Sequence, residues 1–141
     1  MTRRYSYATL AELKRRLGIT DTGEDADLLA ILERVSRAID EHCHRQFFVE
    51  TETRYLTAKE TEVLLLDKDL LAATTLKCDH DGDRTYEETW ASSDYDLLPY
   101  NGFPKTKVET SPDGDYFFST ERKGVEVAGQ WGYGDGLSAT P

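Results

Sequence analysis

The sequence predicts an α+β fold, with an N-terminal helical hairpin packed with a small antiparallel β sandwich or barrel. Apolar residues recur every three or four positions up to residue 46, which is helical spacing. Beyond that point, short segments rich in Val, Thr and aromatic residues alternate with turn residues, which is typical of strands. The length of 141 residues, of which 38% are hydrophobic, suits one soluble globular domain.

The first helix is indicated by both of its ends. Thr9 and Glu12 have the capping-box spacing, in which a hydroxyl and a carboxylate accept hydrogen bonds from free backbone N–H groups. Gly18 suits the left-handed conformation that ends a helix. The three leucines between these ends fall on one helical face. We therefore expect a short helix between Thr9 and Gly18.

The second helix is predicted to be longer and to begin near Glu24–Asp25, because acidic residues favour the positive end of the helix dipole. Its stripe consists of Leu28, Leu32, Val35, Ile39 and His42, at steps of four and three, and is widened by Leu29, Ile31, Ala38 and Cys43. Burial of such side chains stabilises a fold by roughly 1.5–3 kcal/mol each. We therefore expect this stripe to be buried.

The remaining sequence predicts a series of short strands. They are Phe47–Leu56, Glu62–Leu66, Ala73–His80, Arg84–Thr89, Ser93–Leu98, Lys105–Thr110, Tyr116–Ser119 and Val125–Trp131. We expect residues 1–46 to form the helical hairpin, 47–135 to form the β-rich part of the same compact unit, and 136–141 to form a C-terminal tail.

The last strand carries large side chains on one face. Val125 and Val127 alternate with polar neighbours, and Trp131 and Tyr133 continue the Val125 face. We expect Trp131 and Tyr133 to close the core.

Charge and composition exclude several classes of protein. The 17 basic and 27 acidic residues give a net charge of −10, which disfavours general binding to nucleic acid. The charge is uneven, because residues 1–18 hold five basic residues against one acidic residue, Glu12. The longest aliphatic run, Val63–Leu66, is too short to span a bilayer, and the N-terminus lacks an apolar signal segment. Two cysteines, Cys43 and Cys78, do not make a disulfide framework.

Two short motifs suggest metal chemistry. Zinc could be bound by His42-Cys43-His44 together with Cys78-Asp79-His80, but the spacing does not match known zinc signatures. The segment from Asp79 to Asp83 has the composition of a calcium loop, although Gly82 occupies the wrong position for an EF-hand. A hairpin turn at Asp81-Gly82-Asp83 accounts better for that segment. We expect no metal and no cofactor.

Catalytic and DNA-reading motifs are also weak. The sequence lacks the nucleophile elbow, the zinc-protease motif and the Gly-rich phosphate loops, so we expect no catalytic residues. The first two helices suggest a helix-turn-helix regulator, but their connection is long and the second helix is acidic. A small metal-dependent enzyme using His42, His44, Cys78 and His80 is a further alternative.

Several segments in order carry a recognisable pattern: "YATLAELKRRLGI", "DLLAILERVSRAIDEHCHRQF", "LLLDKDLLAATTLKCDHDGDRTY", "SDYDLLPYNGFPKTKV" and "GVEVAGQWGYGD". Their order and spacing resemble those of tailed-bacteriophage head–tail connector (adaptor) proteins. The resemblance covers roughly Tyr5 to Asp135. It is a pattern of order rather than an active-site signature.

The resemblance implies a structural role without catalysis. Such adaptors form a homo-oligomeric ring, typically of twelve subunits, in the neck of the virion, after synthesis in the host cytoplasm. The ring joins the portal protein to a stopper or tail-completion protein and extends the DNA channel, with neither sequence-specific DNA binding nor a membrane involved. Another neck or tail-completion protein is the nearest alternative.

The resemblance also assigns the portal contact by position, and the charge pattern suggests an inter-subunit contact. The role of reaching the portal falls on the C-terminal residues Leu137, Ser138, Ala139, Thr140 and Pro141. In a ring, the basic N-terminal residues would face an acidic neighbour; these are Arg3, Arg4, Lys14, Arg15 and Arg16. Such rim charges steer association more than they add affinity.

Overall fold

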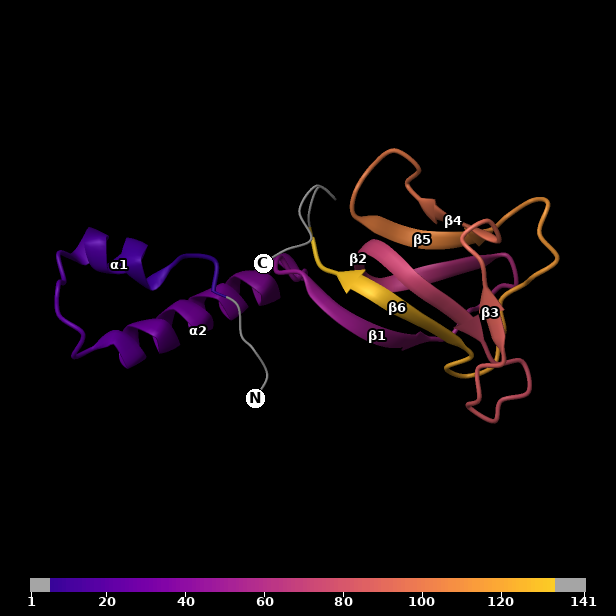
Figure 1. Ribbon diagram of the computed structural model, residues 1–141, viewed down its shortest axis with the longest axis horizontal. Coiled ribbons are helices and arrows are strands. Elements are labelled where there is room, and N and C mark those ends of the chain that lie inside the picture. Colours follow the sequence, from indigo (N-terminus) through magenta and orange to yellow (C-terminus); the bar gives the residue numbers. More distant parts are fainter. Residues whose placement is uncertain (1–5, 134–141) are drawn as a thin grey trace. The chain divides into compact units, whose positions relative to one another are not determined.

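The computed structural model describes residues 6–133, which divide into two compact units between Phe48 and Val49 (Figure 1). The sequence prediction placed the boundary at residue 46 inside a single compact unit. Two units arise because the helices contact each other locally, whereas the strands pair among themselves.

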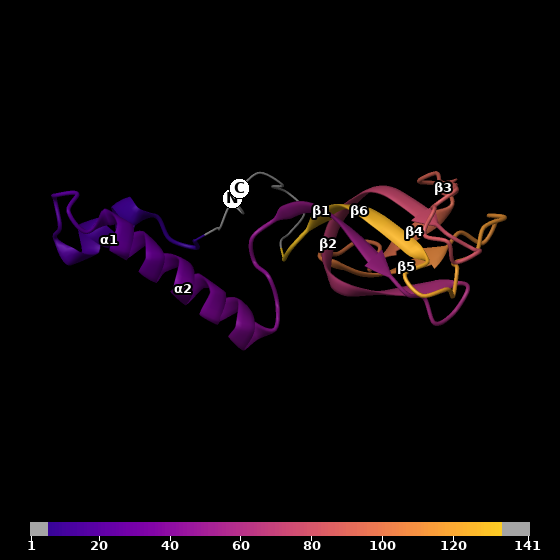
Figure 2. The ribbon, with the colours of Figure 1, turned by 90° about the horizontal axis from the view of Figure 1, so that it is seen from below.

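The first unit is the predicted helical hairpin. Helix α1 spans Leu10–Leu17 and helix α2 spans Asp25–Cys43, and Figure 2 shows α1 lying against α2. The capping box is present, since the Thr9 hydroxyl accepts a hydrogen bond from the Glu12 backbone and the Glu12 carboxylate accepts one from the Thr9 backbone. Gly18 ends α1 in the left-handed conformation, with φ of 71°.

Polar contacts fasten this hairpin. The backbone N–H of Tyr7 donates to the Ser36 hydroxyl at 3.0 Å, and the Tyr7 hydroxyl donates to the Asp40 carboxylate. At the other end, Lys14 Nζ lies 2.7 Å from the Asp25 carboxylate and donates to the Asp21 carbonyl at 2.5 Å. The connection between the helices is therefore held by a cation from α1.

The second unit is a six-stranded antiparallel sheet. Its strands are β1 (Glu50–Leu56), β2 (Val63–Cys78), β3 (Glu88–Trp90), β4 (Tyr95–Leu98), β5 (Lys105–Thr110) and β6 (Val125–Trp131). The strand order is β1-β6-β2-β5-β4, with β3 paired to β2. The α+β class is confirmed, but within residues 49–133 this one sheet does not close into a barrel.

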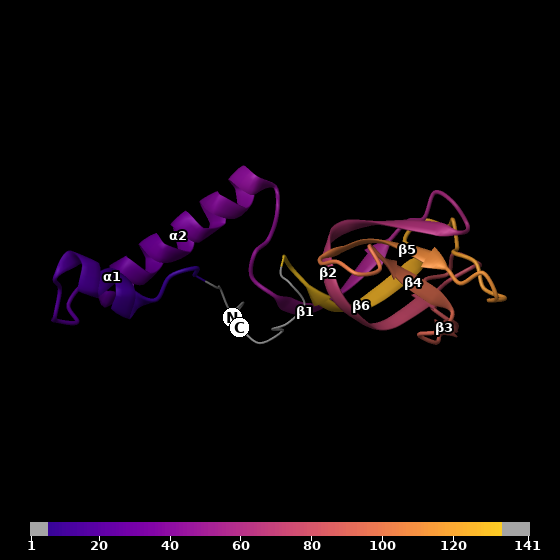
Figure 3. The same ribbon diagram turned by 90° about the horizontal axis from the view of Figure 1, so that it is seen from above.

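Strand β2 replaces two predicted strands. Most of the predicted segments Glu62–Leu66 and Ala73–His80 belong to one strand of 16 residues, which curves as it crosses the sheet in Figure 3. Glu62 precedes this strand, and Asp79 and His80 follow it. Its register with β6 shifts between Leu70 and Ala72 and again between Ala73 and Thr75, which marks bulges. Bulges increase local bending, so one long strand can pair with β5, β6 and β3 in turn.

Two other predicted strands differ from the structure. The strand predicted at Arg84–Thr89 starts later, at Glu88, because the preceding residues form a turn. Residues 116–119 form an irregular segment, in which the Phe118 backbone N–H donates to the Thr61 carbonyl at 2.7 Å. Phe118 is nevertheless fully buried. Its aromatic side chain therefore indicates burial correctly but not strand structure.

The core of the second unit lies between the inward faces of the strands. Its fully buried large side chains are Leu64, Leu70, Leu76, Val108, Phe118, Val125, Val127 and Trp131. The alternating burial along β6 confirms the predicted alternation. Neither described helix, over residues 6–133, has the length and hydrophobicity needed to cross a membrane.

The bulged part of β2 brings its backbone unusually close to β6. A Cβ atom added to Gly129 would lie 2.1 Å from the Ala72 carbonyl oxygen and 3.0 Å from the Ala73 Cα atom. We therefore predict that Gly129→Ala lowers the free energy of unfolding by about 3 kcal/mol or more, since backbone cannot yield as a side chain does.

Urea unfolding followed by circular dichroism measures this loss. Gly23→Ala is the control, because its Cβ would make an ordinary contact of 3.4 Å with the Asp21 side chain. Equal stability of the Gly129→Ala and wild-type proteins would contradict the close approach.

A charge cluster joins β1 to β2. Glu52 Oε1 accepts from Lys68 Nζ at 2.6 Å and from Arg54 at 3.0 Å, and Arg54 also binds Asp67 through two nitrogens. Burial alone would raise the pKa of Glu52, but the hydrogen bonds from Lys68 and Arg54 outweigh it and lower that pKa below its ordinary 4.5. The cluster therefore contributes stability above pH 4.5 that is lost as the pH falls through the folded-state pKa.

We predict that Glu52→Gln lowers the free energy of unfolding at neutral pH by about 1 kcal/mol, because the pair is partly exposed to solvent. The difference from wild type should shrink as the pH falls below 4.5. Urea titrations across pH 3–7 measure it. Glu109→Gln, which removes one surface pair with Lys107, is the control with a smaller loss. A pH-independent deficit in Glu52→Gln would refute the linkage.

Candidate functional site

The apolar stripe of α2 is largely exposed. Leu28 is buried as predicted, but Ile31, Val35 and Ile39 are 50%, 53% and 41% exposed. The prediction that the stripe is buried is therefore wrong for most of its length. These residues recur at spacings of four along one side of α2, so together they form a continuous surface that we call the α2 stripe (Ile31, Val35 and Ile39).

The exposure follows from the size of the first unit. Helix α1 has eight residues, whereas α2 has 19, so α1 can cover only part of its partner. Among residues 6–48, Leu28 and Ser36 are the buried ones. The helical hairpin therefore has an apolar face and very little core.

The basic end of α1 holds three of the predicted charge candidates. Lys14 is bound inside the hairpin by Asp25, with 15% of its side chain exposed. Arg15 and Arg16 are exposed. Arg3 and Arg4 lie outside the described residues. The predicted inter-subunit role stays a prediction, and for Lys14 a neighbour would have to compete with Asp25.

The two aromatic residues predicted to close the core behave differently. Trp131 is fully buried, its indole N–H donates to the Glu52 carbonyl at 3.2 Å, and the Arg54 guanidinium lies over its ring. Tyr133 is 40% exposed, so it does not close the core. The alternation fails because β6 ends at Trp131 and Gly132, with φ of 145°, turns the chain out of the strand.

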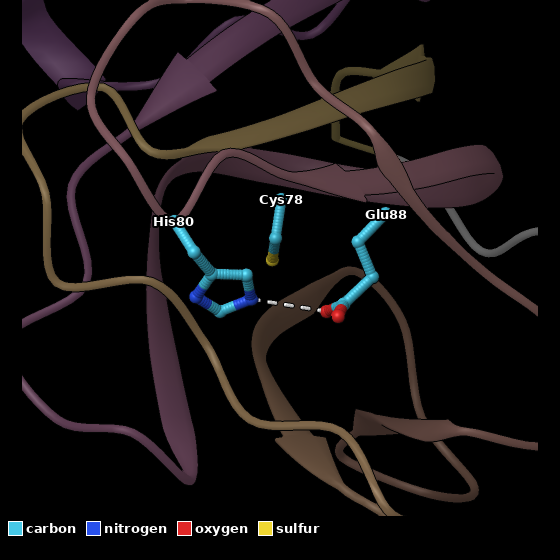
Figure 4. Close-up of side chains that lie close together, drawn as sticks. All are labelled: Cys78, His80 and Glu88. Atoms are coloured by element: carbon cyan, nitrogen blue, oxygen red, sulfur yellow. Dashed lines mark hydrogen bonds and ion pairs between the residues drawn. The ribbon is translucent and has the colours of Figure 1, made fainter.

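Three potential metal ligands converge in the second unit. Cys78, His80 and Glu88 each offer one ligand atom, and these atoms lie within 4.8 Å of one another. Figure 4 shows the three side chains pointing toward a common point, with His80 Nε2 lying 3.1 Å from a Glu88 oxygen. Burial raises the pKa of the Cys78 thiol to about 11. The thiol is therefore neutral at physiological pH.

The zinc set suggested by the sequence is divided between the units. His42, Cys43 and His44 lie at the end of α2 and are exposed, whereas Cys78 and His80 belong to the second unit. Sequence reasoning missed Glu88 as a companion of Cys78. The missing information was the strand register, because Cys78 and Glu88 are direct partners between β2 and β3.

The acidic segment after β2 is a turn, as predicted. Both Asp79 carboxylate oxygens accept backbone N–H groups, from Asp81 and Gly82 on one oxygen and from Arg84 on the other. Burial tends to raise the pKa of Asp79, but these backbone hydrogen bonds lower it overall. Gly82, with φ of 78°, provides the left-handed position of the turn. Asp79 therefore holds this loop in place through three backbone hydrogen bonds.

Comparison with known families decides the relationship of this chain. A family model described as "Phage gp6-like head-tail connector protein" matches residues 7–96. The chain belongs to this family. A search of curated proteins and a search of solved structures each found no match.

The match defines which features lie within the connector pattern. It includes both helices, the α2 stripe and the cluster formed by Cys78, His80 and Glu88. Trp131, Tyr133 and the portal-contact candidates Leu137–Pro141 lie beyond it. The latter five residues lie outside the described residues, so their contact role remains a prediction. Connector membership favours a structural role over the regulator and metalloenzyme alternatives.

Proposed function

We propose that this connector protein is the repeating subunit of a homo-oligomeric ring in the neck of a tailed bacteriophage. The ring, typically of twelve copies, joins the portal protein to a stopper or tail-completion protein and extends the DNA channel. The family match supports the connector role. The α2 stripe is the observation that most directly supports self-association.

The helical hairpin buries few apolar side chains of its own. Ile31, Val35 and Ile39 are each about half exposed, so covering them would contribute roughly 1 kcal/mol each. A hairpin with so little buried surface gains more from such a contact than the sheet unit does. The stripe is therefore the surface by which one subunit contacts the next.

Ring closure also requires that the contact be heterologous, with one face of each subunit meeting a different face of its neighbour. The sequence has this asymmetry, because its first 18 residues are basic and the rest of the chain is acidic. Exposed Arg15 and Arg16 lie on α1, next to the helix that carries the α2 stripe. Charge thus steers subunits into one orientation, while the apolar stripe supplies affinity.

The acidic character also suits a channel through which DNA passes without sequence-specific binding. Each subunit carries a net charge of −10, and a ring sums the fields of its copies. Such a field repels the phosphate backbone and reduces its adhesion to the channel wall. In a ring, the negative charge of each subunit therefore adds to a field that repels DNA from the channel wall.

We predict that Val35→Glu abolishes ring formation. A carboxylate buried without a partner costs several kcal/mol, so association should weaken by about 100-fold or more. Negative-stain imaging with and without assembled portal, together with light scattering after size-exclusion chromatography, measures the oligomer. Retention of full-size rings by Val35→Glu would overturn the assignment of the α2 stripe.

The matched control is Ala26→Glu. Ala26 is also exposed on α2, and helical spacing places it on the side opposite Val35. The substitution adds the same charge near the helix N-terminus, where an acid is tolerated. Rings of Ala26→Glu should match wild type, which separates loss of the stripe from a general effect of charge.

We further predict that ring or portal association weakens as salt rises from about 50 mM to about 500 mM, since screening shortens the reach of surface charges. Arg16→Glu should slow association at low salt, because it reverses an exposed charge at the basic end. Lys59→Glu, an exposed reversal in the second unit, is the control. Stopped-flow scattering that shows no salt dependence would rule out electrostatic steering.

A further inference from the structure

The cluster of Cys78, His80 and Glu88 follows from the pairing of β2 with β3. Cys78 and Glu88 are register partners in an antiparallel pair, so their side chains project on the same face. His80 follows the end of β2 by two residues, and its Nε2 lies 3.1 Å from a Glu88 oxygen, which places the imidazole in the same cluster. The sheet therefore places a thiol, an imidazole and a carboxylate together before any ion binds, as Figure 4 shows.

This donor set is one that zinc prefers. Zinc bonds to cysteine sulfur, histidine nitrogen and carboxylate oxygen at about 2.0–2.3 Å, which separates tetrahedral ligands by roughly 3.6 Å. In the structure all three atoms lie within 4.8 Å of one another, and His80 Nε2 and the Glu88 oxygen are 3.1 Å apart. Small side-chain rotations suffice to bring the atoms to bonding distance.

We propose that Cys78, His80 and Glu88 bind one zinc ion, with a fourth position left for water. The ion takes the place of the hydrogen bond between His80 and Glu88. It bonds to the thiolate sulfur after the Cys78 proton is released to solvent. No other covalent change is required.

The surroundings of the three residues suit a bound cation. The Trp90 indole N–H donates to Glu88 Oε1 at 2.8 Å, and the His80 ring packs against Phe117 at 5.0 Å between centroids, so both ligands are oriented. Cys78 is fully buried, while the His80 and Glu88 side chains keep 33% and 28% of their surface exposed. The sulfur is therefore protected, and the ion can enter from the solvent side.

Zinc would fasten the least supported strand of the sheet. β3 has three residues and, among the described strands, pairs only with β2. A metal bonded to Glu88 on β3 and to Cys78 on β2 joins these strands at the end of their register. His80 adds the start of the Asp79 turn to the same link. Binding should therefore raise the stability of the second unit.

Cobalt titration of the full-length protein, first stripped of metal with a chelating resin, tests the proposal. Co²⁺ should give a thiolate-to-cobalt charge-transfer band that saturates at one ion per chain, and Zn²⁺ should displace it. Thermal unfolding gives a second readout. Zinc at about one hundred times Kd should raise Tm by roughly 10 °C.

The variants separate the cluster from adventitious binding. Cys78→Ala should remove the charge-transfer band, and His80→Asn and Glu88→Gln should each weaken cobalt binding by about tenfold or more. The latter two residues are partly exposed, so these variants test the site even where Cys78→Ala does not fold. Cys43→Ser is the matched control, because Cys43 is an exposed thiol between two histidines.

Cys43→Ser should keep both the band and the zinc-induced rise in Tm. Loss of the band in Cys43→Ser with retention in Cys78→Ala would overturn the proposal. So would a wild-type protein that binds cobalt only in the millimolar range, or that shows no thiolate band. None of these readouts depends on ring assembly.

Discussion

Strand β2 sets the geometry on which the second unit depends. It pairs with β3, β5 and β6, so its register fixes the positions of three other strands at once. The bulges let this strand bend, and they also bring the Ala72 carbonyl so close to β6 that glycine is needed at position 129. At its far end the same register places Glu88 opposite Cys78. The path of β2 thus explains both the close approach at Gly129 and the position of Glu88 beside Cys78.

Local sequence signals predict the ends of α1 correctly, but they do not predict that two segments form one continuous strand. The capping box and Gly18 define α1 because a helix end depends on residues that are adjacent in sequence. By contrast, the two strands predicted on either side of residues 67–72 are one strand, β2. The strand continues because Lys68 and Asp67 find partners in Glu52 and Arg54 on β1. Such cross-strand compensation cannot be predicted from periodicity alone.

The α2 stripe and the Cys78 cluster also depend on contacts that periodicity does not predict. Helical spacing correctly predicts that apolar residues line α2, but the expected burial of Val35 and Ile39 is wrong, because spacing does not specify which surface covers a stripe. A similar ambiguity affects Cys78, whose partner Glu88 is ten residues away in sequence and directly opposite in the sheet. Tyr133 failed as a core residue for a simpler reason, since Gly132 ends the alternation on which the prediction relied.

The two units solve the problem of stability in different ways. The sheet has its own core, built around Trp131, Phe118 and the leucines of β2. The helical hairpin is held by hydrogen bonds and an ion pair that involve Tyr7 and Lys14, but it has little buried apolar area. In the proposed ring, contacts between subunits would add the missing stabilisation, and these contacts depend on subunit concentration. This connector therefore combines a sheet unit that has its own core with a helical hairpin whose apolar stripe is exposed in the single chain.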